Sequence, residues 1–277
     1  MRDTADGLVI KEIAVGESDK LITVLTADKG KLLISAKGVR SMKSKNIALC
    51  RIFTYANFEY YERAGKYWLA SGEINDSFFG LNRDIESLAL ASYIVDLANE
   101  LSGENSPDGT LLRVTLNTLY AIENKLRPLD QIKGAFEFFV AAHAGFSPDV
   151  SACKKCGQAD AEAFYLDVMN GALLCCECIK SKEIAITGEM PEYDRFATKN
   201  VLLPISNEVI MAIRYAINAD PKRLFSFTLK SENDIKTFSH AGEIYLQNHL
   251  ERGFDTLDFY HDIKSFAAPS AKNNTLT

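Results

Sequence analysis

Two closely spaced pairs of cysteines constrain this chain more than any other feature of its sequence. Cys153 and Cys156 form one CxxC pair, and Cys175 and Cys178 form a second after eighteen intervening residues. Thiolate sulfur suits Zn²⁺, and two CxxC turns can supply the four ligands of a tetrahedral site. Cys176 stands only two positions before Cys178, so we do not expect it to be a ligand. The pattern predicts one structural Zn²⁺ ion.

The residues between the cysteine pairs indicate how such a site would be built. Residues 163–167 and 171–174 are two short β-rich runs, which predict the hairpin of a zinc ribbon within residues 151–186. Four sulfur ligands leave no open position for water or substrate, so this metal would hold the module together and take no part in catalysis. The alternative is that the cysteines are redox-active or are paired by coincidence.

The first 72 residues have the rhythm of a small β-barrel. Asp28, Lys29 and Gly30 form a turn between two apolar runs, with Gly30 able to take a left-handed conformation. About five strands in roughly 70 residues, with no long helix between them, are typical of an OB-type barrel, which we place at residues 1–79. The predicted strands are residues 8–10, 21–26, 31–36, 56–61 and 67–71.

After the barrel, the apolar residues recur at helical spacing, from about residue 81 onward. The sequence therefore predicts an α+β multidomain protein: an N-terminal OB-fold barrel, a helical domain, and a four-cysteine zinc ribbon inserted into that domain. Residues 186–191 resemble a linker. The expected divisions after the barrel are residues 80–150 and 187–262 for the helical domain, 151–186 for the ribbon and 263–277 for a loose tail.

Positive charge is concentrated in the barrel segment. The chain has a net charge of −6, yet residues 1–72 carry twelve Lys or Arg against eight Asp or Glu, and the remainder carries nineteen against twenty-nine. Such an asymmetry is compatible with a local nucleic-acid surface on an acidic protein. The candidate DNA-binding residues are Lys29, Lys31, Lys37, Arg40, Lys43, Lys45 and Arg51.

Aromatic residues stand close to these cations in the sequence. Phe53, Tyr55 and Tyr67 could offer stacking faces to unpaired bases while the basic segment follows a phosphate backbone. For each aromatic residue, packing in the barrel core is the stronger expectation. For the basic segment, the alternative is an ordinary solvated loop. Lys154 and Lys155 could also contact DNA, or they could simply be exposed residues of the zinc knuckle.

Several classes of protein lack their usual signals here. The sequence contains no HExxH pair, no Walker A motif and no GxSxG elbow, so we expect no enzyme activity. It has no signal-peptide pattern at its start and no run of about 18 uncharged apolar residues, which predicts neither secretion nor membrane insertion. Paired cysteines in such a chain favour metal binding in a reducing cytoplasm over disulfides.

Taken in order, several segments resemble the RecO family of recombination mediators. The family pattern is matched at residues 7–10, 16–21, 26–31 and 36–40 in the barrel, at residues 145–148, at both CxxC pairs with Gly171 before the second, and at residues 250–260. Together these matches span nearly the whole chain, and their common order is more specific than any one of them.

The resemblance implies a DNA repair and recombination mediator that acts without catalysis. Such a protein binds single- and double-stranded DNA, anneals complementary strands, and works with RecR to help RecA load onto DNA coated by single-strand-binding protein. The resemblance also implies a cytoplasmic, nucleoid-associated location. Two other functions stay open from the residues alone: a zinc-ribbon scaffold that binds RNA or protein in transcription or translation, and, as a third class, an enzyme.

Overall fold

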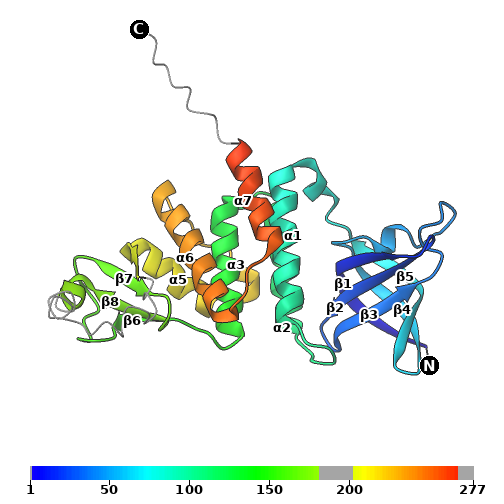
Figure 1. The fold of residues 1–277 in the computed structure, drawn as a ribbon, viewed down its shortest axis with the longest axis horizontal. Helices are drawn as coiled ribbons and strands as arrows, with labels where there is room; N and C mark the ends of the chain where they lie inside the picture. The colour runs from blue at the N-terminus through cyan, green and yellow to red at the C-terminus, as the bar shows by residue number, and fades with distance from the viewer. Residues whose placement is uncertain (1, 181–201, 268–277) are drawn as a thin grey trace, which may run out of the picture. The chain divides into compact units, whose positions relative to one another are not determined.

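A closed β-barrel occupies the N-terminal part of the computed structural model, which describes residues 2–180 and 202–267 (Figure 1). The strands follow the order β1-β2-β3-β5-β4, and β4 pairs with β1 to close the barrel. This closure confirms the OB-type barrel that the five apolar runs predicted. The strands are β1 (Arg2–Val15), β2 (Asp19–Thr26), β3 (Gly30–Ala36), β4 (Tyr55–Arg63) and β5 (Lys66–Asp76).

Strand β1 is the longest and pairs on both sides. Its first half lies against β4, with Arg2 opposite Tyr61, and its second half lies against β2, with Val15 opposite Asp19. The register of β1 with β2 shifts between Val9 and Lys11, which marks a β-bulge. A bulge increases the local twist of a strand, and β1 can therefore pass from one side of the barrel to the other.

The barrel interior is apolar, as strand alternation requires. On β3, Leu32 and Ile34 are buried whereas Leu33, between them, is 48% exposed. On β4, Phe58 and Tyr60 are buried in the same core cluster. Full burial of one such side chain stabilises the fold by roughly 1.5–3 kcal/mol, and the barrel is held together mainly by this contribution.

The turn between β2 and β3 needs a glycine for two separate reasons. Gly30 has a φ of +65°, which favours glycine, and a Cβ placed there would lie 2.4 Å from the carbonyl oxygen of Gly103. The backbone N–H of Lys31 donates to that same oxygen at 3.0 Å. The turn therefore holds the loop of residues 102–108 directly against the barrel.

Three helices belong to the same compact unit as the barrel, which we call the barrel unit (Met1–Asn124 and Gly253–Thr277). Asp84 and Asp108 cap the first two helices through their side chains. The third packs on the first, where Thr256 donates to Asp96 at 2.9 Å. The helices are α1 (Ile85–Leu101), α2 (Gly109–Glu123) and α7 (Asp255–Ala267), with short 3₁₀ turns at Ala48–Cys50 and Phe79–Arg83.

Helix α7 corrects one expectation. Residues 263–267, which we assigned to a loose tail, are the last part of this helix. Its buried residues Leu257 and Tyr260 are three positions apart, so they fall on one helical face. The rest of the expected tail, residues 268–277, lies outside the described residues.

The second compact unit, Lys125–Arg252, combines helices with a small sheet and contains all four cysteines of the CxxC pairs, so we call it the cysteine unit. Its sheet has the strand order β6-β8-β7-β9. The elements are α3 (Leu129–His143), β6 (Asp149–Cys153), β7 (Phe164–Asp167), β8 (Ala172–Cys175), β9 (Leu202–Ile205), α5 (Asn207–Asn218), a 3₁₀ turn (Pro221–Arg223) and α6 (Glu232–Leu250).

The sheet of the cysteine unit lies, in sequence, between helices that pack on one another. Helix α3 precedes the sheet and contacts both α5 and α6, which follow it. The β7–β8 hairpin predicted between the cysteine pairs is confirmed, whereas β9 was not predicted. The expected linker at residues 186–191 lies outside the described residues.

A charged cluster is buried among the helices of the cysteine unit. The Lys133 side chain is 1% exposed, and its Nζ lies 3.1 Å from Glu137 Oε1 and 2.7 Å from Glu243 Oε2. Lys133 also donates to the backbone oxygen of Ser239 at 3.2 Å. Burial by itself lowers the pKa of Lys133, but the two carboxylates outweigh it and raise the pKa overall.

The two units group the helices differently from our division of the chain. Helices α1 and α2 fall within residues 80–150 together with α3, yet they belong to the barrel unit and α3 belongs to the cysteine unit. Apart from the start of the expected tail, which helix α7 corrects, the borders of the five expected ranges remain a prediction.

Candidate metal centre and nucleic-acid interface

The structure brings the four cysteines of the CxxC pairs together. The sulfur atoms of Cys153, Cys156, Cys175 and Cys178 all lie within 4.8 Å of one another. The Sγ atoms of Cys156 and Cys175 are 3.7 Å apart. Cys153 and Cys175 are buried, Cys178 is half-buried and Cys156 is exposed. The group has the arrangement expected of a metal site.

Strand pairing explains why the two cysteine turns meet. Strands β6 and β8 run parallel, with Cys153 opposite Leu173, so the chain turns that follow both strands lie at the same end of the sheet. After Cys153 the chain turns back at Gly157, whose N–H donates to the Cys153 carbonyl at 2.8 Å. After Cys175 the chain becomes helical over residues 176–180, which positions Cys178.

The clustered thiols differ in acidity. Burial by itself raises the pKa of Cys153, but backbone N–H groups of Cys156, Cys175 and Lys155 donate to its sulfur and lower the pKa to about 6. The thiol of Cys175, followed by burial, raises the pKa of Cys178 to about 12. One thiol of the group is therefore more acidic than another, and a divalent cation bound among the four sulfurs would favour the thiolate form of all of them.

The remaining cysteines lie outside this group. Cys176 is half-buried and follows Cys175 directly, but it is not among the clustered ligands. Cys50 is buried in the barrel core, and burial raises its pKa to about 12. Such a thiol is a small apolar core residue and a poor nucleophile.

The basic loop, residues 37–45, follows β3 and is anchored at its base while its cations point outward. Asp19 accepts a hydrogen bond from the Gly38 N–H at 2.7 Å, which is the main reason that the pKa of Asp19 is lowered. The Arg40 guanidinium donates to the carbonyl of Gly16 at 3.0 Å. Met42, at the loop tip, is 97% exposed. The exposed cations of the loop are Lys37, Arg40, Lys43 and Lys45.

The three other candidate cations have different surroundings. Arg51 is exposed. Lys31 is half-buried and donates to the Asn99 carbonyl at 2.8 Å. Lys29 forms an ion pair with Asp3 and donates to the Tyr60 hydroxyl at 2.6 Å. Burial lowers the pKa of Lys29, but these two partners outweigh it and raise the pKa overall. Lys29 is thus already engaged by the barrel.

The aromatic residues divide between the core and the surface. Phe53 is buried, and Tyr55 and Tyr67 are half-buried. Sequence reasoning missed an outward pair on neighbouring strands: Tyr61, 45% exposed, stacks on Trp68 with ring centroids 5.9 Å apart. Strand alternation beside the buried Tyr60 was a signal that could have placed Tyr61 on the outside.

The protein combines a five-stranded OB-type barrel, which carries an exposed basic loop, with a four-cysteine cluster. These two features define a class of proteins that have a candidate nucleic-acid surface and a candidate metal centre. Comparison with known families is consistent with this class. Residues 1–78 match the family model described as Recombination protein O N terminal, and residues 82–258 match Recombination protein O C terminal. The chain belongs to the recombination protein O family.

Individual relatives are similar over most of their length. The chain is 31% identical to the DNA repair protein RecO of Acetivibrio thermocellus over 253 residues, which cover 91% of this chain and 94% of that protein. It is 29% identical to the DNA repair protein RecO of Halalkalibacterium halodurans, over 85% of this chain and 86% of that protein. It is 24% identical to the DNA repair protein RecO of Caldicellulosiruptor saccharolyticus, over 94% of this chain and 98% of that protein.

Within residues 2–180 and 202–267, no helix combines the length and the apolar character that crossing a bilayer requires.

Proposed function

We propose that this protein acts in DNA repair as a recombination mediator that works by binding and not by catalysis. It would bind single- and double-stranded DNA, anneal complementary strands, and cooperate with RecR to help RecA load onto DNA coated by single-strand-binding protein. Membership of the recombination protein O family supports the DNA repair role, because relatives across nearly the full length are named DNA repair proteins. Its place of action would be the nucleoid in the cytoplasm.

The basic loop is the observation that carries the DNA-binding part of this proposal. Four exposed cations project from a segment anchored to the barrel through Asp19 and Gly16. Two DNA strands repel one another through their phosphates, so a surface that neutralises phosphates and leaves base edges free lowers the cost of their meeting. This mechanism needs no nucleotide hydrolysis and no reactive side chain.

The cysteine cluster would hold one structural Zn²⁺ ion. A Zn–S distance of about 2.3 Å in a tetrahedron places the sulfurs about 3.8 Å apart, and Cys156 and Cys175 have a sulfur separation of 3.7 Å. Cys153, Cys156, Cys175 and Cys178 would be the four ligands. Zinc bound there would supply folding free energy to the sheet, and four thiolates would leave it no position for a reacting water.

Annealing of two complementary fluorescent oligonucleotides tests the mediator activity. The strands are mixed naked or coated with single-strand-binding protein, in the presence or absence of the purified chain and without nucleotide. We expect the chain to accelerate annealing of the coated strands. No acceleration by a folded, zinc-loaded protein would contradict the proposal, and tighter binding to RNA than to DNA in competition would favour an RNA-interaction scaffold instead.

Charge reversal tests the location of the DNA surface. The double variant Lys43→Glu/Lys45→Glu should weaken binding to all sequences alike, because phosphate contacts carry no sequence information. With about four to six phosphates neutralised by the wild type, the log-log salt slope should be roughly −3 to −5 and should become shallower in the variant. The double variant Lys222→Glu/Lys230→Glu, which makes the same change in net charge at exposed residues of the cysteine unit, is the matched control. Equal weakening by both would remove the basic loop as the principal site.

A further inference from the structure

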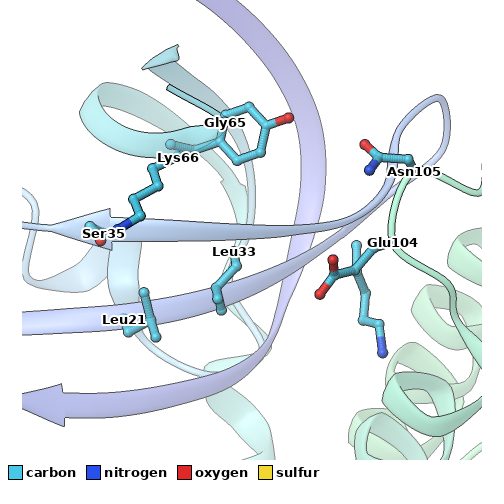
Figure 2. Close-up of a pocket in the computed structure, with 9 residues that line it drawn as sticks. Leu21, Leu33, Ser35, Gly65, Lys66, Glu104 and Asn105 are labelled. Atoms are coloured by element: carbon cyan, nitrogen blue, oxygen red, sulfur yellow. The ribbon is translucent and has the colours of Figure 1, made fainter. Parts of the chain in front are cut away.

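A pocket on the outer face of the barrel is distinct from the basic loop (Figure 2). Its volume is about 390 Å³, and its lining comes from β2, β3, the β4–β5 hairpin and the loop of residues 102–108. All of these segments belong to the barrel unit. Small-molecule pockets in proteins range from ~300 to 1,000 Å³, so this one has room for a ligand the size of a single nucleotide.

The floor of the pocket is apolar although it faces solvent. Leu33 is 48% exposed, and Figure 2 shows it beside Leu21 of the neighbouring strand. Tyr67, half-buried, also lines the pocket and makes an edge-to-face contact with Tyr60 at 5.4 Å between ring centroids. The exposed Leu33, the half-buried Leu21 and the Tyr67 ring offer a planar ligand an apolar surface from which it displaces water.

The rim of the pocket carries polar and charged groups. Lys66 extends along one side toward Ser35, and Glu104 and Asn105 lie on the opposite side (Figure 2). Lys31 adds a second cation, held in place by its hydrogen bond to the Asn99 carbonyl. The amide of Asn105 and the hydroxyl of Ser35 can each donate and accept hydrogen bonds. The carboxylate of Glu104 repels phosphate, so an anionic group would sit on the Lys66 side.

The far wall of the pocket is held in position by the glycine turn of the barrel. Gly30 allows the backbone of residues 103–106 to approach closely, and backbone pairing joins Glu104 to Gly30 and Lys31. Asn105 has a φ of +54°, a left-handed conformation that asparagine adopts more readily than most residues. The pocket is therefore formed before any ligand arrives, which reduces the entropic cost of binding.

We propose that this pocket binds one unpaired nucleotide of single-stranded DNA. The base would lie on Leu33 and Tyr67, its edge would meet Ser35 and Asn105, and its phosphate would lie near Lys66. A base within a duplex is stacked and paired, and it would have to leave the helix to enter, at a cost of a few kcal/mol. The pocket thus gives the DNA binding proposed above a preference for single strands. This inference rests on that proposed function.

Binding of oligonucleotides with and without bases tests the pocket in the full-length protein. Fluorescence anisotropy would compare a deoxythymidine oligomer with a fully abasic oligomer of equal length. Because a stacked base is worth about tenfold or more in affinity, we expect the wild type to prefer the base-containing oligomer by about that factor. Ser35→Phe, which fills the pocket without changing charge, should reduce the preference at least threefold, and so should Leu33→Ala.

Matched variants separate the pocket from the basic loop. Ile13→Ala, at an outward position of β1 that is 45% exposed, should leave the preference unchanged and controls for loss of surface apolar groups. Lys43→Glu/Lys45→Glu should change the salt slope and keep the base preference. Unfolding midpoints of all variants confirm that they fold.

The outcomes distinguish the two proposals. Equal affinity of the wild type for both oligomers, or an unchanged preference in Ser35→Phe and Leu33→Ala, overturns the nucleotide pocket and leaves the basic-loop proposal standing. A folded wild type that binds neither oligomer overturns both. A reduced preference with an unchanged salt slope in the pocket variants supports the assignment.

Discussion

The barrel unit and the cysteine unit bury very different polar groups. Among the described residues, the buried polar side chains of the barrel unit are all hydroxyls: Thr23, Thr26, Thr54, Ser87, Ser102, Thr115 and Thr118. The cysteine unit buries one hydroxyl, that of Ser239, but also Lys133, Glu137, Asp167 and Gln131, as well as two of the clustered cysteines. One unit depends on apolar burial, whereas the other adds ionised groups and sulfur ligands to its interior.

The difference indicates how each unit responds to its surroundings. Apolar burial changes little with pH or chelators, whereas thiolate ligands and buried ion pairs depend on protonation and on metal supply. The short strands of the cysteine unit, four or five residues each, would bury too little apolar surface to hold a sheet without further support. The barrel achieves closure with longer strands and no metal cluster of its own among the described residues.

Removal of the metal should have the largest effect on stability, and it tests the difference between the two units most directly. Structural zinc contributes apparent binding free energies of about 10–16 kcal/mol in small modules. Chelation, or Cys153→Ser, should therefore expose the sheet of residues 149–175 to hydrogen exchange and leave the barrel protected. Hydrogen exchange followed by mass spectrometry measures both units at once.

Cys176→Ser is the control for that experiment, since Cys176 adjoins the cluster without belonging to it. It should keep both the metal content and the protection of the sheet. A sheet that stays fully protected after complete loss of metal would show that apolar packing holds both units alike, and the comparison would fail.

Loss of the buried lysine should give the next largest effect. Lys133→Ala removes the cation shared by Glu137 and Glu243, and breaking a buried ion pair costs about 3–5 kcal/mol. Urea denaturation should show a loss of this size in the cysteine unit. Lys236→Ala, which breaks a similarly spaced but exposed pair with Glu232, should have far less effect. Equal losses of unfolding free energy in the two variants would mean that burial of the ion pair does not change its contribution to stability.

A substitution at the β2–β3 turn probes the barrel side of the comparison. Gly16 and Gly30 both have positive φ, but only at Gly30 does an added Cβ meet other backbone atoms. Alanine in a left-handed conformation costs about 1–2 kcal/mol. We expect roughly that loss for Gly16→Ala and roughly 1–2 kcal/mol more for Gly30→Ala, measured by thermal unfolding. Similar losses would show that residues 102–108 move aside easily.

Acid should have the smallest effect, and it should act at the base of the basic loop. The Gly38 N–H, followed by the Ser18 hydroxyl, lowers the pKa of Asp19 from its ordinary value of 3.8. This stabilisation is present above pH 3.8 and is lost as the pH falls through the lowered pKa. Unfolding midpoints of wild type and Asp19→Asn should differ slightly at neutral pH and converge in acid. A difference that persists in acid would assign the effect to something other than the carboxylate charge.

Much of the fold followed from local patterns in the sequence. Short apolar runs separated by turn residues predicted the barrel strands, two β-rich runs predicted the β7–β8 hairpin, and the cysteine spacing predicted the set of residues that cluster. Helix α7 was missed because acidic and polar residues interrupt its buried positions, Leu257 and Tyr260. The association of α1, α2 and α7 with the barrel was also missed, because it depends on packing between segments far apart in the chain.

The candidate site was predictable only in part for the same reason. Exposure of Lys43 and Lys45 is a local property that a polar, turn-rich segment indicates. The engagement of Lys29 by Asp3 and Tyr60 depends on the barrel closing. The pocket around Leu33 exists only because a loop more than 60 residues away meets the β2–β3 turn, which periodicity alone does not report.

The double pairing of β1 also has a consequence for the order of folding. Of the strands that the structure describes, β1 leaves the ribosome before the others, yet one of its partners, β4, ends only at Arg63. A β1–β2–β3 meander can form early, but the barrel cannot close until residues 55–63 have emerged. Such distant pairings slow folding and leave strand edges unpaired in the meantime. During synthesis, the growing chain therefore passes through a stage in which the edge of β1 is unpaired. At that stage the edge can pair with another chain and aggregate, or it can be bound by a chaperone.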